Sequence, residues 1–330
     1  MIDVAVVGLG WWGRNIVGLL DGSERLRPVL AVDPQPEGRA WAAARGLAAT
    51  GDLQEALDDP RIDAVVLCSP HRFHADQIVA AAEAGKHVFC EKPFTTTVAE
   101  ADVAMAAVRA AGVTLGVGHE RRFEPAVMEL QERCRSGDLG VPLLFEGNFS
   151  QDKFLVLPAD NWRLSPSLAP VGPLSATGIH LVDLAVSILG EPESVWARLS
   201  TRATTFANGD TLSITLAFAD GATATVNASL TTPFVGRMCV LGSEGWMEIR
   251  DRTHPEDPTG WDVTTVHRDR GREDRFLPPS PPVRNNLERF AEAIEGTGTY
   301  PVTTAEIRAT VRAFEAITRS ALRGTVERLD

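Results

Sequence analysis

The stretch that decides the fold is Val6-Val7-Gly8-Leu9-Gly10-Trp11-Trp12-Gly13, near the start of a 330-residue chain. A β-branched run ends in its first glycine, and a helical pattern follows from Trp12 to Leu20. The spacing G-x-G-x-x-G between a strand and a helix is typical of dinucleotide-binding turns. Gly8 makes the tight turn, Gly10 lets the backbone approach a pyrophosphate, and Gly13 lets the helix pack closely on the strand. The N–H groups at the helix N-terminus then face the phosphates.

Asp33 follows the second apolar run, Pro28–Val32, at the distance expected of a ribose-binding carboxylate. A carboxylate there accepts hydrogen bonds from ribose hydroxyls and repels a 2′-phosphate, which favours NAD over NADP. Arg39 comes a few residues later and leaves NADP open as a cofactor. Trp11 and Trp12 are bulky for this turn. They have two interpretations, contact with the cofactor or simple packing.

Outward from this turn, short apolar runs alternate with helical patterns as far as residue 120. Further runs with strand character are Ala64–Cys68, His87–Cys90 and Thr114–Val117, with helical patterns over His74–Ala84 and Ala99–Ala111 between them. Strands and helices in regular succession predict an α/β fold, a doubly wound parallel sheet with right-handed crossovers. Residues 1–120 are therefore predicted to form an NAD(P)-binding Rossmann domain.

After residue 120 the pattern changes, and residues 121–330 are predicted to form a separate α+β domain. Apolar and polar residues alternate from Leu212 to Phe218, and Asp220-Gly221 is a strong hairpin signal, so a mostly antiparallel sheet is expected. The charged run Gly271–Arg275 is expected to be a solvated turn. Helices are expected over residues 125–135, 177–189, 283–294 and 304–322, with a long loop over 152–172.

Composition and charge exclude several classes of protein. The chain is 44% hydrophobic and 23% charged with a net charge of −12, so nucleic acid and anionic membranes are not expected partners. No apolar run approaches the ~18–20 residues of a membrane span. The sequence opens directly on a strand, without a basic leader, and Cys68, Cys90, Cys134 and Cys239 are widely spaced. A cytoplasmic protein with reduced cysteines and no metal site is therefore expected.

Two segments that follow neighbouring strands carry polar side chains. In an open α/β sheet, ligands bind at the carboxyl ends of the strands, so both segments are predicted to approach the cofactor. Lys92 is one of only three lysines, and lysine, unlike arginine, is a compact donor that can lose its proton. The candidate cofactor-binding residues are Ser69, Pro70, His71, His74, Glu91 and Lys92, in addition to Gly8, Gly10, Trp11, Trp12, Gly13 and Asp33.

Along essentially the whole chain, the sequence resembles the glucose–fructose oxidoreductase, inositol dehydrogenase and MocA family (Gfo/Idh/MocA). The motifs are Gly8–Gly13, Ser69-Pro70-x-x-x-His74, Ala84-Gly85-Lys86-His87-Val88-x-x-Glu91-Lys92-Pro93 and Gly178-Ile179-His180-x-x-Asp183. The resemblance implies a Rossmann domain followed by an α+β domain whose open-faced sheet often forms a dimer interface. It also implies a homodimer or homotetramer that transfers hydride between a nicotinamide cofactor and a carbohydrate-like hydroxy compound. Lys92 would then act near the reacting oxygen.

His180 is the candidate general base, because histidine titrates near neutrality. Asp183 lies three residues later on the same helix face and is expected to hold the imidazole tautomer. Relatives of the dehydrogenase type commonly carry an aspartate four residues before this histidine, where this chain has Ala176. Asn161-Trp162-Arg163 is a candidate substrate-binding segment or a loop anchor, since arginine can hold an anion while indole stacks on a sugar.

These residues together predict an NAD(P)-dependent dehydrogenase or reductase. Its substrate would be a sugar, a sugar acid or a cyclic polyol, with Lys92, His180 and Asp183 as the catalytic residues. Two alternatives remain at this point. One is a hydrolase or lyase that retains NAD and oxidises the sugar transiently, and the other is a non-catalytic nucleotide-binding sensor.

Overall fold

The structure is a computed structural model that describes residues 1–329. The chain forms two compact units: unit 1 comprises Met1–Glu120 and Val283–Arg308, and unit 2 comprises Arg121–Pro282 and the chain from Ala309 onward. The sequence predicts that all of residues 121–330 belong to the second domain. Residues 283–308 pack in unit 1 instead, because Leu287 and Phe290 are buried in its hydrophobic core.

Unit 1 contains a six-stranded parallel sheet in the order β3-β2-β1-β4-β5-β6, which confirms the doubly wound prediction. Its strands read as continuous apolar runs because helices cover both faces. From β1 the chain adds β2 and β3 on one side and then adds β4, β5 and β6 on the other side. In open α/β sheets, ligands bind at the point between β1 and β4 where this order reverses. Strand β3 is not predicted by the sequence, because a strand of three residues is too short to show an alternating pattern. The strands are β1 (Ile2–Val7), β2 (Leu26–Val32), β3 (Ala48–Thr50), β4 (Ala64–Leu67), β5 (His87–Cys90) and β6 (Leu115–Val117).

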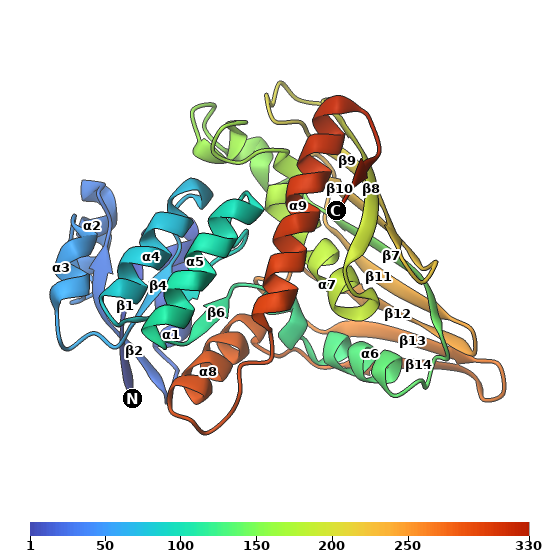
Figure 1. Cartoon of the computed structure of the whole chain (residues 1–330), viewed down its shortest axis with the longest axis horizontal. Helices are drawn as coiled ribbons and strands as arrows, with labels where there is room; N and C mark the ends of the chain where they lie inside the picture. Colours follow the sequence, from blue (N-terminus) through green and yellow to red (C-terminus); the bar gives the residue numbers. More distant parts are fainter. Residues whose placement is uncertain (330) are drawn as a thin grey trace. The chain divides into compact units, whose positions relative to one another are not determined.

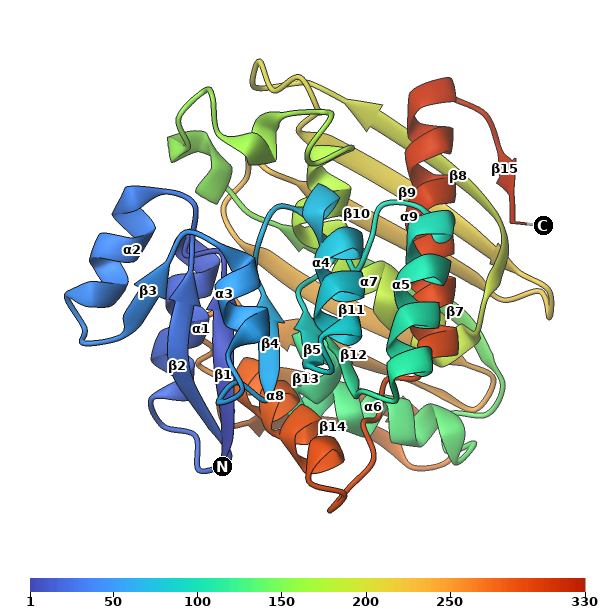
Figure 2. The ribbon, with the colours of Figure 1, turned by 60° about the vertical axis from the view of Figure 1, so that its left-hand side comes forward.

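The helices of unit 1 begin and end at recognisable caps. Thr97 and Glu100 form a capping box at the start of α5, and Gly112 ends that helix with a φ of 69°. Figures 1 and 2 both show α4 and α5 side by side. The helices are α1 (Trp11–Leu20), α2 (Pro36–Ala43), α3 (Leu53–Asp58), α4 (His74–Glu83), α5 (Val98–Ala111) and α8 (Pro282–Ile294).

Unit 2 contains a nine-stranded sheet in the order β14-β13-β12-β11-β7-β10-β9-β8-β15. Neighbours are antiparallel except β7 and β10, so the prediction of a mostly antiparallel sheet is confirmed. Gly271–Arg275, expected as a turn, is part of the edge strand β14, whose backbone pairs with β13. Its charged side chains are exposed except that of Arg275, which is partly buried. The strands are β7 (Pro142–Ser150), β8 (Pro192–Ser200), β9 (Thr211–Phe218), β10 (Thr223–Ser229), β11 (Val235–Gly242), β12 (Gly245–Asp251), β13 (Trp261–His267), β14 (Gly271–Leu277) and β15 (Glu327–Arg328).

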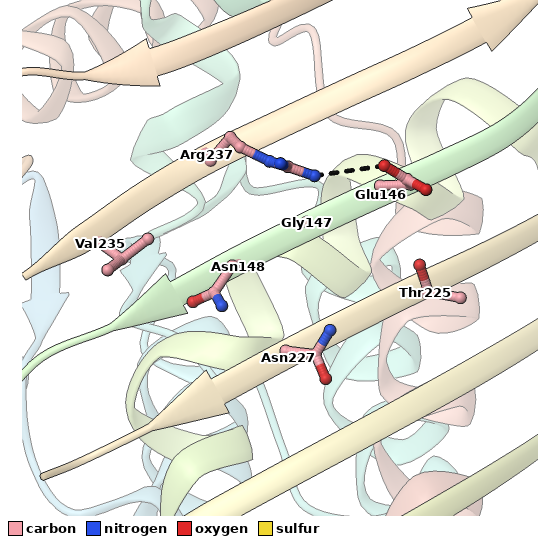
Figure 3. A pocket seen from close by; sticks show the side chains of 7 residues that line it. All are labelled: Glu146, Gly147, Asn148, Thr225, Asn227, Val235 and Arg237. Atoms are coloured by element: carbon pink, nitrogen blue, oxygen red, sulfur yellow. Dashed lines mark hydrogen bonds and ion pairs between the residues drawn. The ribbon is translucent and has the colours of Figure 1, made fainter. Parts of the chain in front are cut away.

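Helices cover one face of this sheet and leave the other face open. The core between them includes Phe145, Leu181 and Phe314, contributed by β7, α7 and α9. On the open face, Glu146, Asn148 and Arg237 line a shallow hollow of about 300 Å³ (Figure 3). The covering helices are α6 (Pro125–Arg135), α7 (Ile179–Leu189) and α9 (Thr304–Arg323). None of the helices within residues 1–329 is both long enough and apolar enough to cross a bilayer.

Candidate active site

The turn between β1 and α1 has the form of a phosphate cradle. Gly8 adopts a φ of 91°, and a Cβ there would lie 2.9 Å from the backbone of Cys68 and Ser69. A Cβ on Gly13 would overlap the carbonyl oxygen of Gly8, whereas a Cβ on Gly10 would meet nothing within 4 Å. The backbone at Gly10 is therefore open to close approach, and no side chain caps the N-terminus of α1. These features fit the pyrophosphate of a dinucleotide.

Asp33 lies at the end of β2 and is buried against this turn. Its Oδ2 accepts a hydrogen bond from the Leu9 N–H at 2.5 Å, and its Oδ1 accepts one from the Gln35 N–H at 2.8 Å. Arg39 Nη1 donates to the carbonyl oxygens of Asp33 and Pro34, both at 2.8 Å. The carboxylate is thus fixed beside the glycine turn, as ribose binding requires, with a guanidinium anchored next to it.

His74 joins the two polar segments that follow β4 and β5. Its ring is fully buried, with Nδ1 2.8 Å from the Pro93 carbonyl oxygen and Nε2 2.9 Å from that of Ser69. Burial lowers the pKa of His74. His74 therefore braces the two loops, and its contact with the cofactor stays a prediction. His71 packs edge-on against the His74 ring, with centroids 5.9 Å apart.

Glu91 is a buried carboxyl group at the carboxyl end of β5. Burial raises its pKa to about 7, against the opposing effects of the Trp12 indole and the Lys92 ammonium. A Cβ on Gly118, after β6, would collide with the Glu91 carboxylate, so only glycine fits there. Segments after β1, β5 and β6 therefore meet at Glu91. The sequence placed Glu91 and Trp12 among the cofactor residues but did not indicate that they are neighbours.

His180 lies in the first turn of α7, directly after a π-helical turn over Leu174–Gly178. Its side chain is buried, and its ring packs against Phe149 of β7 with centroids 5.7 Å apart. The hydroxyls of Ser175 and Thr177 donate to the carbonyl oxygens of Pro170 and Pro173. The π-helical turn before His180 is therefore fixed by side-chain hydrogen bonds to its own backbone, and the imidazole packs against an aromatic ring.

Asp183, on the same helix, forms a buried ion pair with Arg122. Arg122 Nε donates to Oδ2 and Nη2 donates to Oδ1, both at 2.7 Å, and Thr310 Oγ1 donates to Oδ1 at 3.1 Å. Both carboxylate oxygens thus bind groups other than the His180 imidazole. Support of the imidazole by Asp183 stays a prediction, whereas anchoring of α7 is what the structure shows. The pair was not foreseen because its partners are 61 residues apart.

The segment Asn161-Trp162-Arg163 combines a loop anchor with a stacked cation. Asn161 Oδ1 accepts from the Arg163 N–H at 3.0 Å, and the Arg163 guanidinium lies 4.5 Å from the Trp162 ring centroid. Burial lowers the pKa of Arg163 to about 10, although the carboxylate of Glu256 opposes this. Substrate binding by the Trp162–Arg163 pair stays a prediction. It is consistent with the ability of arginine to bind an anionic group with two hydrogen bonds.

Comparison with known proteins establishes the family. A model described as an oxidoreductase family with an NAD-binding Rossmann fold matches residues 2–119, and a Gfo/Idh/MocA C-terminal domain model matches residues 127–248. D-xylose 1-dehydrogenase (NADP(+)) 2 of Haloferax volcanii is 32% identical over 323 residues, which cover 96% of each chain. The chain belongs to the Gfo/Idh/MocA family. The expected resemblance, the fold and the class of NAD(P)-dependent oxidoreductase are thereby confirmed.

Two further relatives span nearly the whole chain. The scyllo-inositol 2-dehydrogenase (NAD(+)) of Bacillus subtilis is 31% identical, covering 100% of this chain and 96% of the relative. The crystal structure of an aldose-aldose oxidoreductase from Caulobacter crescentus, complexed with glycerol, matches with a TM-score of 0.87 and 27% identity over 99% of both chains. The relatives' names include both NAD and NADP, so either cofactor remains open for this family member.

Proposed function

We propose that this chain transfers a hydride between a nicotinamide cofactor and a hydroxyl or keto carbon of a sugar, sugar acid or cyclic polyol. The observation that carries the proposal is the glycine cradle with Lys92 on the same carboxyl edge of the parallel sheet. The relatives named for xylose and inositol support a polyhydroxylated substrate.

In the oxidation direction, His180 takes the proton of the reacting hydroxyl, and the Lys92 ammonium stabilises the alkoxide that forms. A bound nicotinamide supplies the hydride acceptor. Glu91 is adjacent to Lys92 and has a pKa near 7, so its charge state modulates the field at the ammonium around neutral pH. Asp33 binds the adenosine ribose, and Trp162 with Arg163 binds the substrate.

The test compares Lys92→Met with the wild type on a panel of aldoses, sugar acids and inositols. Reduction of NAD or NADP is followed at 340 nm, and NADH binding is followed separately by tryptophan fluorescence. We expect wild-type turnover, and a loss of about 100-fold or more in kcat for Lys92→Met with NADH affinity within about twofold of wild type.

Lys86→Met is the matched control, because within residues 1–329 the Lys86 ammonium donates only to the carbonyl oxygens of Asp59 and Ile62, at 2.8 and 2.9 Å. This variant should lose stability while its folded fraction keeps the wild-type kcat. Full activity of Lys92→Met would remove the catalytic assignment. Release of a leaving group without net NADH would indicate the NAD-retaining lyase or hydrolase, and cofactor binding without any turnover would indicate the sensor.

We also propose a cytoplasmic homodimer or homotetramer that associates through the open face of the nine-stranded sheet. The four cysteines are free, which suits a reducing compartment. The half-exposed Trp196 of β8 and the polar hollow around Asn148 give this face both apolar and polar contact surface. Light scattering that shows a monomer at micromolar concentration would refute the association.

A further inference from the structure

A cluster of rings in unit 2 surrounds one phenylalanine, Phe149 of β7. Its ring centroid lies 5.7 Å from that of His180, 5.5 Å from that of His254 and 6.1 Å from that of Phe234. Phe149 is buried, and its strand neighbours fix its position in the sheet. Phe149 is therefore a direct packing partner of the candidate base and of two further rings.

A buried cation faces the same ring. The guanidinium carbon of Arg121 lies 5.3 Å from the Phe149 centroid, and the side chain of Arg121 is 1% exposed. Its Nε donates to Glu124 at 3.1 Å, and its Nη2 donates to both oxygens of Asp251 at 2.7 and 2.8 Å. Within residues 1–329, Nη1 has no hydrogen-bond acceptor. The π face of Phe149 is thus the available partner for this edge of the cation.

Two buried carboxyl groups, those of Glu124 and Asp251, bind the guanidinium of Arg121. Burial raises the pKa of Glu124 to about 8 and also raises that of Asp251, while the Arg121 guanidinium and the Trp261 side chain oppose both shifts. Near neutral pH, burial thus favours the protonated form of Glu124, while Asp251 accepts both hydrogen bonds from Nη2 of Arg121. Phe149 thus packs against a guanidinium that two buried carboxyl groups hold in place.

We propose that Phe149 is a positioning residue for His180, and that the buried Arg121–Glu124–Asp251 cluster holds it in place. The proposal rests on the proposed function, in which His180 becomes an imidazolium when it takes the substrate proton. An aromatic ring within about 6 Å stabilises such a cation, and a fixed ring also restricts the orientation of the imidazole. Phe149 therefore favours both the reactive geometry and the protonated state of His180.

Other charged groups near the cluster are themselves paired. His254 lies 3.4 Å from Glu256, and Glu256 forms an ion pair with Lys153. On α7, the Asp183 carboxylate is bound by Arg122. A change at Phe149 alone leaves these pairs in place, so an altered titration of His180 reports on the ring.

The experiment compares Phe149→Leu, Phe149→Tyr and the control Phe145→Leu. Phe145 is buried on the same strand and face, so its substitution costs similar packing without touching His180. The His180 pKa is measured by ¹H–¹⁵N NMR of histidine-labelled protein, with the signal assigned from His180→Gln. The pH profile of kcat is measured on the best substrate of the panel.

We expect Phe149→Leu to lower the His180 pKa by about 0.5–1 unit and kcat by about tenfold, with KM within threefold of wild type. Phe149→Tyr should restore both, and Phe145→Leu should change neither. An unshifted His180 titration and unchanged kcat in Phe149→Leu would overturn the proposal, as would an equal effect of Phe145→Leu. If Phe149→Leu does not fold, Phe149→Met replaces it with the same criteria. Absence of turnover in the wild type would reject the proposed function, while the NMR comparison would still decide the role of Phe149.

Discussion

Replacing Asp183 by asparagine should strongly destabilise unit 2, because it breaks a buried ion pair. Arg122 donates two hydrogen bonds of 2.7 Å to the Asp183 carboxylate, and the two side chains are 6% and 2% exposed. Asparagine is nearly isosteric but neutral, so the variant removes the carboxylate charge that accepts these two hydrogen bonds from the buried guanidinium of Arg122. Removing one partner of such a pair costs about 3–5 kcal/mol, and we expect a loss of this size in the free energy of unfolding.

Urea unfolding followed by circular dichroism and tryptophan fluorescence measures this loss. The control is Glu132→Gln, which removes an ion pair with Arg135 whose side chains are 62% and 70% exposed, and it should cost less than about 0.5 kcal/mol. Unfolding of Asp183→Asn at the wild-type urea concentration would refute the reasoning. A variant of unchanged stability and reduced kcat would instead support the sequence-based role of Asp183 at the imidazole.

Three further predictions concern unit 1. Gly13→Ala should abolish NADH binding in a fluorescence titration, because its Cβ would overlap the Gly8 carbonyl oxygen; binding at wild-type affinity would contradict the cradle geometry. Burial raises the pKa of Glu91 from 4.5 to about 7, so ionisation destabilises the fold as pH rises from 4.5 to 7. Glu91→Gln should therefore gain up to about 3 kcal/mol over wild type at pH 8 and nothing at pH 4, and equal thermal unfolding of both proteins at pH 8 would disprove this. Burial raises the pKa of the Cys68 and Cys90 thiols, so a disulfide reagent at pH 7.5 should label both only after denaturation.

The sequence predicted the elements with a strong local period, and it failed where the local signal was weak. Residues 125–135 were predicted as a helix and match α6, because Pro125 starts the helix and Gly137 follows its end. The edge strand β14 was expected as a turn because charges occupy both of its faces. Strand β3 was missed because three residues show no period. An edge strand can carry this composition because it depends on backbone pairing to one neighbour and buries little side-chain surface.

The sequence by itself determined the Rossmann half of the protein and its nucleotide chemistry. Its signals are local: the glycine spacing, the carboxylate of Asp33 at a strand end, and the Glu91-Lys92-Pro93 turn. Local patterns of this kind can be recognised in the sequence without knowledge of the fold. Only the tertiary structure decided what surrounds the candidate base His180. Arg122 meets Asp183 across 61 residues, and Arg121 meets Asp251 across 130. Such pairs leave no local period, since their contacts depend on how distant segments pack and which charges are buried together.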